Sequence, residues 1–402
     1  TAHAVHSNRR SAGRHAIGAM GGVGDPIDPY WFAGFGIACA QFATRSWEDA
    51  LFSFQKVMVK GGATAALYRN LARCHLFLDC ADKAREELEQ ALALEDAPDT
   101  RLALARLFEK LSLREGAVAQ LEHLTLTERD MPDPWRMLGE LYRREADWAR
   151  AEACYVQLVK LLPEDAGGWF RLGSCRRHLG RLEEALSSYR VAIRIRPDHS
   201  RALYGAATIH EARGENGEAI SLLRQAIAGN EPMEKSYNLL ASVYQNEGRI
   251  REAVAVYLEA VARFPEDGLL QANLGAAQVM AGFHDRALKP FKAAVRLGEN
   301  DPSIYTMWVK SLFELKHAHE AVRVLKDACA AHPEDAGLRY LSARAKARCH
   351  DTEGAIGDLE AAVAMDADLR LDARACGDFA TIRTAPGFIN LIRLPLRSDR
   401  TS

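Results

Sequence analysis

Apolar residues recur in this chain at helical spacing, in blocks that repeat about every 34 residues. The clearest block runs from Pro132 to Asp165. Its first half places apolar residues three or four positions apart, at Trp135, Leu138, Gly139 and Tyr142. This spacing puts side chains on one face of a helix. The second half repeats the pattern with Ala151 and Tyr155 before Pro163, so the block predicts two helices joined by a short turn.

The same pattern extends over most of the chain. Alanine recurs in register, with steps of 34, 33 and then 34 residues, at Ala50, Ala84, Ala117, Ala151, Ala185, Ala219, Ala253, Ala287, Ala321 and Ala355. A bulky apolar residue lies four positions after each alanine, at Phe54, Leu88, Leu121, Tyr155, Tyr189, Leu223, Tyr257, Phe291, Leu325 and Leu359. Antiparallel helices approach closely only where a small side chain lies at their crossing and a bulky neighbour fills the adjacent space. The pattern therefore predicts about ten helical hairpins in series.

The residues between the expected helices have the chemistry that helix ends require. Glycine stands at the expected turn within four of the hairpins, at Gly180, Gly214, Gly248 and Gly282. Proline followed by one or two acidic residues stands between hairpins, at 163–165, 197–198, 265–267 and 333–335. Proline ends one helix, and the acid that follows can cap the start of the next.

The period and the W-x2-L-G-x2-Y spacing of the block at 132–165 resemble the tetratricopeptide-repeat (TPR) family. The resemblance extends over about 365 of the 402 residues. It implies an all-α fold, a right-handed superhelix (α-solenoid) of helix-turn-helix repeats. In that family the first helix of each repeat lines a concave groove.

The chain outside the repeats divides into three segments. We expect a flexible basic arm at 1–29, because three arginines and several glycines precede the first acidic residue, Asp25. An organelle-targeting remnant and an arm that folds back onto the repeats are the alternatives. Ten repeats are expected at 30–369. Residues 370–395 are similar to the closing segment of bacterial TPR proteins, and we expect them to cap the last hairpin, followed by a tail at 396–402.

Composition excludes several classes of protein. The formal net charge is only −2, so nothing global indicates nucleic acid or a membrane surface. No run of 18 or more apolar residues occurs, and we expect a soluble protein. The eight cysteines contain no C-x-x-C pair, so we expect free thiols in the cytoplasm or another reducing compartment.

The sequence contains none of the short motifs that carry catalysis or hold cofactors. Nucleotide-binding glycine loops, a G-x-S-x-G elbow and an H-E-x-x-H zinc motif are all missing from its 402 residues. His317 and His319 share one turn but have no third ligand nearby, and we interpret them as solvated. We expect no enzyme, no cofactor and no metal.

The candidate binding residues lie at the positions that the TPR resemblance assigns to the groove. Counted from the start of each repeat, these are positions 2, 5, 9, 12 and 13, on the helix face away from the packing positions 4, 7, 8 and 11. The residues that we single out there are Arg69, Arg73, Arg106, Lys110, Arg136, Arg143, Arg144, Arg177, His178 and Asn238. Acidic residues oppose them at Asp99, Glu109, Asp133 and Glu140. The basic residues either bind a ligand, or they form ion pairs with these acids and are only part of a solvated surface.

Arginine presents a fork of donors that matches carboxylate or phosphate. Our hypothesis is therefore a non-catalytic scaffold or adaptor that binds an extended acidic peptide, or a partner helix, in its groove. The alternative is a structural or regulatory subunit of a larger assembly that uses its convex or terminal surfaces. Single-stranded nucleic acid is disfavoured, because the basic stretch has few interleaved aromatic residues beyond Phe77 and Phe170.

Overall fold

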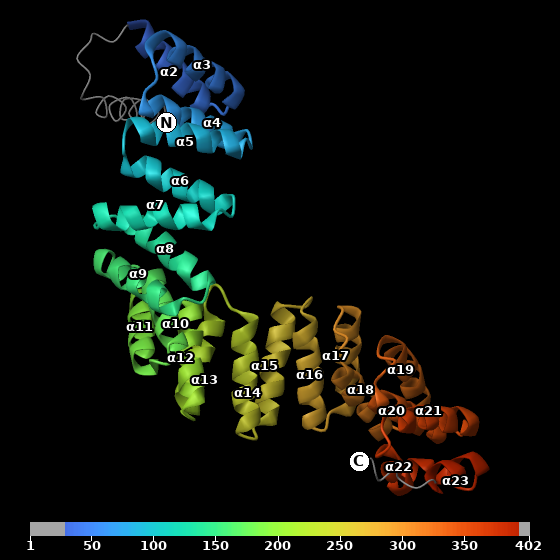
Figure 1. Ribbon diagram of the computed structural model, residues 1–402. Helices are drawn as coiled ribbons and strands as arrows, with labels where there is room; N and C mark the ends of the chain where they lie inside the picture. Colours follow the sequence, from blue (N-terminus) through green and yellow to red (C-terminus); the bar gives the residue numbers. More distant parts are fainter. Residues whose placement is uncertain (1–28, 394–402) are drawn as a thin grey trace, which may run out of the picture. The chain divides into compact units, whose positions relative to one another are not determined.

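The computed structural model describes residues 29–393, and every element there is helical (Figure 1). The all-α fold expected from the sequence is confirmed for this part of the chain. The predicted arm at 1–29, apart from Pro29, and the predicted tail at 396–402 lie outside the described residues. The chain divides into two compact units, Thr1–Leu179 and Gly180–Ser402, and each is described by itself.

From Pro29 on, unit 1 contains four helical hairpins followed by one further helix. The paired helices are α2 (Pro29–Ala43) with α3 (Trp47–Gly61), α4 (Ala65–Phe77) with α5 (Ala81–Leu94), α6 (Pro98–Lys110) with α7 (Arg114–Thr127), and α8 (Pro132–Arg144) with α9 (Trp148–Leu161), and the further helix is α10 (Ala166–His178).

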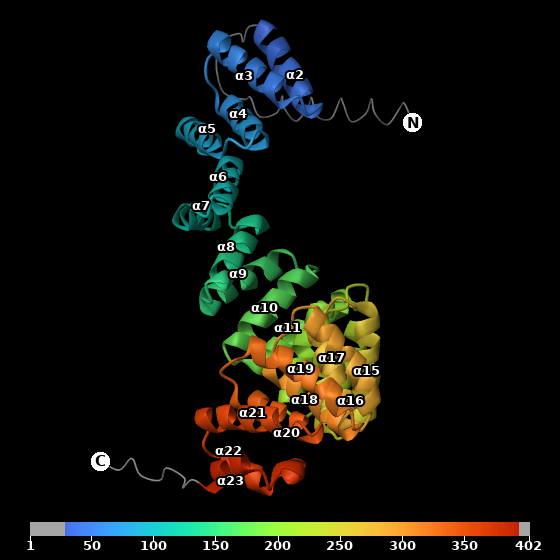
Figure 2. The same ribbon diagram turned by 90° about the vertical axis from the view of Figure 1, so that its right-hand side faces the viewer.

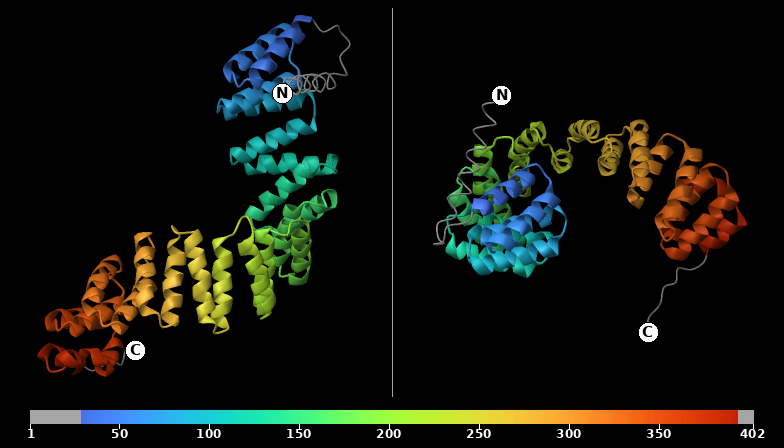
Figure 3. Two further views of the ribbon diagram at one scale, coloured as in Figure 1. Left: turned by 180° about the vertical axis from the view of Figure 1, so that it is seen from behind. Right: turned by 90° about the horizontal axis from the view of Figure 1, so that it is seen from above.

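Unit 2 begins with α11 (Leu182–Ile195), continues through five hairpins and ends in three short helical segments. The hairpins are α12 (Ser200–Ala212) with α13 (Asn216–Ala228), α14 (Glu234–Asn246) with α15 (Ile250–Arg263), α16 (Gly268–Met280) with α17 (His284–Arg296), α18 (Pro302–Glu314) with α19 (Ala318–Ala331), and α20 (Ala336–Arg348) with α21 (Thr352–Met365). The closing segments are α22 (Leu369–Ala375), the 3-10 helix η1 (Gly377–Ile382) and α23 (Pro386–Arg393). Helices α14 to α17, yellow to orange in the figures, stand side by side in Figure 1 and again from behind in Figure 3.

The turn between paired helices requires left-handed backbone at one fixed position of the repeat. Glycine occupies this position four times, with φ between 73° and 79°, at Gly180, Gly214, Gly248 and Gly282. In the other repeats a residue with a side chain takes the same conformation, with φ between 57° and 64°, at Arg45, Asp79, Ser112, Ala146, Lys316 and His350. A non-glycine residue there costs about 1–2 kcal/mol. The turn is therefore imposed by the packing of the two helices, and glycine only makes it easier.

Three of the four aspartates that follow the inter-hairpin prolines cap the next helix, as the sequence predicts. Asp198 does not, because His199 is the N-cap of α12 and its Nδ1 accepts from the backbone N–H of Ala202. The side chain of Asp165 accepts a hydrogen bond from the backbone N–H of Gly167, 3.0 Å away. Asp267 and Asp335 accept from the residues three positions later, at 2.9 Å and 2.8 Å. Each cap satisfies a backbone donor that the first turn of a helix leaves without a partner.

The small-and-bulky pattern marks where paired helices cross. All ten alanines that recur in register are 0% exposed, and the bulky residues four positions later are at most 5% exposed. In unit 1, Gly139 of α8 lies against the Tyr155 ring, and a Cβ built on it would lie 3.0 Å from that ring. In unit 2, Gly275 of α16 lies against Phe291, with a corresponding separation of 2.7 Å. The two units therefore use the same contact.

The C-terminal segments cover the apolar face of the last hairpin (Figures 1 and 2). Phe379, Ile382 and Phe388 are at most 1% exposed and pack into one core with the apolar side chains of α20 and α21. An ion-paired cluster fixes this cap. Arg344 and Arg348 of α20 both donate to Asp378, at 2.8 Å and 2.7 Å.

The first prediction concerns the helix crossing. Gly275→Ala forces a methyl group against the buried Phe291 ring, so it lowers the free energy of unfolding by about 1–3 kcal/mol. Gly357→Ala is the matched control, because Gly357 lies within α21 with no neighbouring atom within 4 Å. That change raises stability by up to about 1 kcal/mol through helix propensity. Urea and thermal unfolding followed by circular dichroism measure both, and opposite signs are expected.

The second prediction concerns the cap. Burial alone would raise the pKa of Asp378, but the hydrogen bonds from Arg348 and Arg344 outweigh burial and hold the pKa below its ordinary value. A depressed carboxyl pKa stabilises the fold above the unfolded pKa of about 3.9, and this contribution is lost as pH falls through the folded pKa. At pH 7, Asp378→Asn should therefore cost the cap about 2 kcal/mol.

Hydrogen exchange in α22 and α23, corrected for the intrinsic rate, measures this cost. Exchange should be faster in the variant at pH 7, and the difference from wild type should vanish in acid, once Asp378 is protonated. An unchanged rate at pH 7 would contradict the assigned role of Asp378.

Candidate functional site

The ten residues singled out in the sequence divide between the two units, nine in unit 1 and Asn238 in unit 2. Nine of them belong to unit 1: Arg69 and Arg73 on α4, Arg106 and Lys110 on α6, Arg136, Arg143 and Arg144 on α8, and Arg177 and His178 on α10. Asn238 lies on α14 of unit 2, where its Oδ1 accepts a hydrogen bond from Asn273, 2.9 Å away. Asn238 is therefore separate from the basic set.

Ion pairs connect the basic residues to neighbouring repeats. Four of them reach a carboxylate 26 to 35 positions away: Arg69 to Glu95 (3.4 Å), Lys110 to Asp79 (3.3 Å), Arg106 to Asp133 (3.0 Å) and Arg144 to Glu109 (2.8 Å). We call this series the ion-pair ladder. The side chains of Arg106, Lys110 and Arg144 remain 56% to 58% exposed. Exposed pairs of this kind contribute only about 0–1 kcal/mol each.

Among the candidate residues, the closest charged contact lies on α8. Arg143 donates two hydrogen bonds to Glu140, at 2.6 Å and 2.9 Å. The hydrogen bond from Arg143 outweighs burial and lowers the pKa of Glu140 below its ordinary value. Arg136 lies between Asp133 (2.8 Å) and Asp165 (3.5 Å). The arginines of α8 are therefore held in place by acidic side chains on the same helix and in the loop that follows α9.

Two of the candidate residues contact aromatic rings. The guanidinium of Arg73 lies 4.7 Å from the centre of the Phe42 ring. The imidazole of His178 stacks on Trp148 at 3.9 Å, with an angle of 5° between the planes. Burial, then the charges of Arg177 and Arg143, lower the pKa of His178, so it is neutral at pH 7. Because these contacts use the flat faces of the guanidinium and the imidazole, they do not use the nitrogen atoms at the edges of either group.

An aromatic cluster beside Arg73 was missed in the sequence. Trp47 and Phe77 stack at 4.1 Å, and Phe42 meets both rings edge-on. Phe77 remains 57% exposed. Phe42 and Phe77 occupy groove positions 12 and 13 of their repeats, so the spacing that identified the arginines could also have identified these rings.

Charge is sorted between the two kinds of helix in unit 1. The first helices α4, α6, α8 and α10 contain eleven Arg or Lys and four Asp or Glu. The second helices α5, α7 and α9 contain five Arg or Lys and seven Asp or Glu. The first helices thus carry a formal charge of +7 and the second helices −2. A protein with a net charge of −2 therefore has a strongly basic set of first helices.

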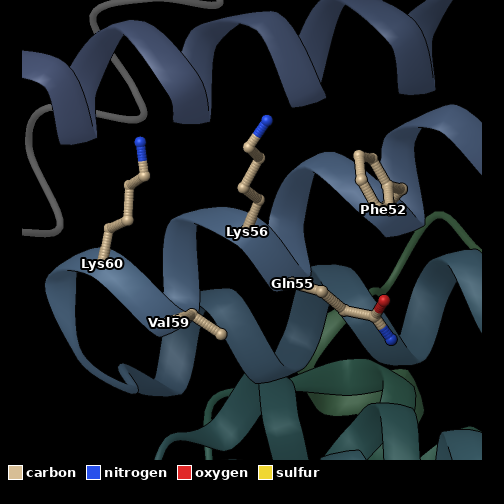
Figure 4. A pocket seen from close by; sticks show the side chains of 5 residues that line it. All are labelled: Phe52, Gln55, Lys56, Val59 and Lys60. Atoms are coloured by element: carbon tan, nitrogen blue, oxygen red, sulfur yellow. The ribbon is translucent and has the colours of Figure 1, made fainter.

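A second surface of unit 1 exposes apolar side chains. On α3, Phe52 is 65% exposed and Val59 is 85% exposed. Gln55, Lys56 and Lys60 complete a shallow pocket with them (Figure 4). The ammonium of Lys56 lies 5.7 Å from the Phe52 ring. Apolar side chains between lysines are typical of a contact surface rather than of a catalytic cleft.

The residues that could hold metal or react chemically are dispersed. Between residues 29 and 393, no three His, Cys, Asp or Glu side chains are grouped as metal ligands, and His317 instead lies 4.0 Å from Glu320. The eight cysteines are free, and burial raises the pKa of the Cys154 and Cys175 thiols to about 12. No helix in this part of the chain is both long and apolar enough to cross a bilayer.

Comparison with known proteins agrees with the repeat pattern. The tetratricopeptide-repeat family model matches residues 136–200 and 238–302, one stretch starting in each unit. No curated protein matches the sequence.

Solved structures of tetratricopeptide-repeat and related proteins match the chain at low identity, with TM-scores below 0.5. A tetratricopeptide repeat protein from Parabacteroides merdae is 18% identical, covers 62% of this chain and 98% of its own, and has a TM-score of 0.44. The C-terminal part of a TPR protein from Cytophaga hutchinsonii is 14% identical, and the match covers 68% of this chain and 98% of that one, with a TM-score of 0.45. Yeast Tom70 is 16% identical, and the match covers 91% of this chain and 99% of that one, with a TM-score of 0.35.

The family match, the 34-residue period and the helical hairpins with buried small residues at their crossings agree with one another. The chain is a tetratricopeptide-repeat protein, a helical-repeat scaffold of the kind that mediates protein–protein interaction.

Proposed function

We propose that this protein is a non-catalytic scaffold or adaptor that binds an extended acidic segment of a partner along the first helices of unit 1. The sorting of charge supports this proposal most directly, because the first helices carry +7 while the second helices carry −2. The surface meant is the exposed part of α4, α6 and α8 around Arg73, Arg106, Lys110 and Arg144. We call it the first-helix surface.

The ion-pair ladder is compatible with binding, because its pairs exchange easily. A partner carboxylate that reaches Arg106 or Arg144 replaces Asp133 or Glu109. The exposed pair that is lost contributes only about 0–1 kcal/mol, so the exchange costs little. The released acidic side chain returns to water, where it is well solvated.

Specificity for an extended segment follows from the spacing of the ladder. Three of its four pairs join neighbouring repeats, and Arg69 pairs with Glu95 in the loop that follows α5, so the basic side chains recur once or twice in every repeat along α4, α6 and α8. A compact anion meets one or two of them, whereas an extended chain meets several in succession. Affinity is then the sum of small, similar contributions. The exposed Phe77 ring beside Arg73 offers an apolar contact at the α4 end of this surface.

The surface of α3 carries the second candidate function, a structural or regulatory subunit of a larger assembly. Phe52 and Val59 are exposed there on the second helix of the first described hairpin (Figure 4). A partner that docks on them would bind through apolar contact, which responds little to salt. Salt dependence therefore separates the two candidates.

The third prediction tests the first-helix surface. The probe is a fluorescent twelve-residue peptide of alternating Glu and Gly, beside the same peptide with Gln in place of Glu. The variant Arg106→Gln/Lys110→Gln/Arg144→Gln should weaken binding of the acidic peptide at least about tenfold, since each charged contact contributes about 0.5–1 kcal/mol. Affinity of the wild type should also fall steeply between 50 mM and 500 mM salt.

The matched control removes the same charge from second helices. The variant Lys83→Gln/Arg85→Gln/Lys160→Gln changes α5 and α9 by three positive charges and should keep the wild-type affinity within about twofold. An equal loss of affinity in both variants would mean that binding depends on the net charge of the protein and not on the first-helix surface. Equal affinity for the Glu and Gln peptides would refute acidic recognition, and Phe52→Ser/Val59→Ser would then test the surface of α3.

A further inference from the structure

The last hairpin departs from the packing pattern of the hairpin before it. In the ninth repeat, the buried face of α18 includes Tyr305, Trp308 and Leu312, which are at most 8% exposed. In the tenth repeat, the residues 34 positions later are Arg339, Ser342 and Lys346 of α20. Their spacing of three and four keeps them on one helix face. Three large side chains of a core are thus replaced by two cations and a hydroxyl.

The facing helix changes in a complementary way. Val324 of α19 is 8% exposed, and the residue 34 positions later is Asp358 of α21. Asp358 Oδ2 accepts hydrogen bonds from Ser342 Oγ at 2.5 Å and lies 2.6 Å from Lys346 Nζ. The polar residues therefore form one connected group and are not isolated substitutions.

The smaller side chains leave a cavity. A surface pocket of about 420 Å³ lies between α19, α20 and α21. Its polar wall consists of Arg339, Ser342, Lys346 and Asp358, and Leu325 and Cys329 belong to its apolar wall. Burial raises the pKa of the Cys329 thiol, so this residue is a neutral part of the wall at pH 7. The volume lies within the range of about 300–1,000 Å³ typical of small-molecule sites.

The pocket has an excess of positive charge and a donor without a partner. Lys326, Arg339 and Lys346 line it with a single carboxylate, Asp358, so its formal charge is two positive. Lys346 is close to Asp358, but Arg339 Nη1 is 3.9 Å from Asp358 Oδ1, beyond hydrogen-bond distance. Arg339 Nε is buried and has no hydrogen-bond partner among the described residues. A buried donor without a partner is costly, and an oxyanion would satisfy it.

We propose that this pocket binds a small organic oxyanion, with the carboxylate or phosphate group on Arg339 and Lys346 and the apolar body against Leu325 and Cys329. The guanidinium fork of Arg339 presents parallel donors to two oxygens of such a group. The small side chain of Ser342 leaves open the volume that Trp308 fills at the equivalent position of the preceding repeat. The site lies in unit 2 and is independent of the first-helix surface, so either proposal can fail without the other.

The fourth prediction is tested by isothermal titration calorimetry on the full chain. The probes are benzoate, phenyl phosphate and the neutral benzyl alcohol. Benzoate or phenyl phosphate should bind with a stoichiometry of one, at least about tenfold more tightly than benzyl alcohol, because hydrogen bonds to charged groups dominate. The tighter of the two anions identifies the natural head group as carboxylate or phosphate.

Variants separate recognition from folding. Arg339→Gln should weaken anion binding at least about tenfold while circular dichroism stays that of wild type. Arg323→Gln is the matched control, because Arg323 is an exposed arginine of α19 outside the pocket, and it should bind like wild type. Asp358→Asn should bind the anion severalfold more tightly, because it removes the internal competitor, and a damaged fold cannot produce that result.

Three results would overturn the proposal. They are equal binding of benzyl alcohol and the anions, wild-type affinity in a folded Arg339→Gln variant, and binding that Arg323→Gln weakens as much as Arg339→Gln does.

Discussion

The close approach of two helices within each hairpin is the contact on which the rest of this structure depends. Gly139 against Tyr155 in unit 1 and Gly275 against Phe291 in unit 2 leave no room for a larger residue at the crossing. The alanine of the second helix is fully buried in every repeat. Because the helices are held this closely, the connecting turn adopts left-handed backbone even at Ala146 or Lys316, where the residue itself opposes it.

Fixed packing positions leave the remaining positions of each helix free to carry function. In unit 1 the free positions of α4, α6, α8 and α10 hold arginine and lysine, whereas α2 contains neither. In unit 2 the tenth repeat changes packing positions instead, so that Arg339, Ser342 and Lys346 replace a core and open a pocket. An extended surface and a local site thus arise from the same repeat, by substitution at different positions.

The fold could be predicted from the sequence because its pattern recurs. A small residue followed four positions later by a bulky one recurs ten times and reveals the hairpins. Gly180 and Gly214 mark turns, because glycine readily adopts the positive φ that the turn requires. The ion-pair ladder could not be predicted, because partners such as Arg144 and Glu109 lie 35 residues apart and meet only through stacking of repeats. The stack of Trp148 on His178 was missed for the same reason. The repeat pattern could not reveal the pocket beside Asp358. The pattern identifies residues that the repeats share, whereas the pocket lies where the tenth repeat differs from the ninth.

The central claim is that a partner binds along the first helices of unit 1, and hydrogen–deuterium exchange on the full chain tests it most directly. The partner would first be captured from the native source and purified, and exchange would be compared with and without it. If the partner binds there, exchange should be slower at the exposed ends of α4, α6 and α8, with α3 and the cap of α22 and α23 unchanged. Protection confined to α3 or to the cap, with α4, α6 and α8 unaffected, would contradict it.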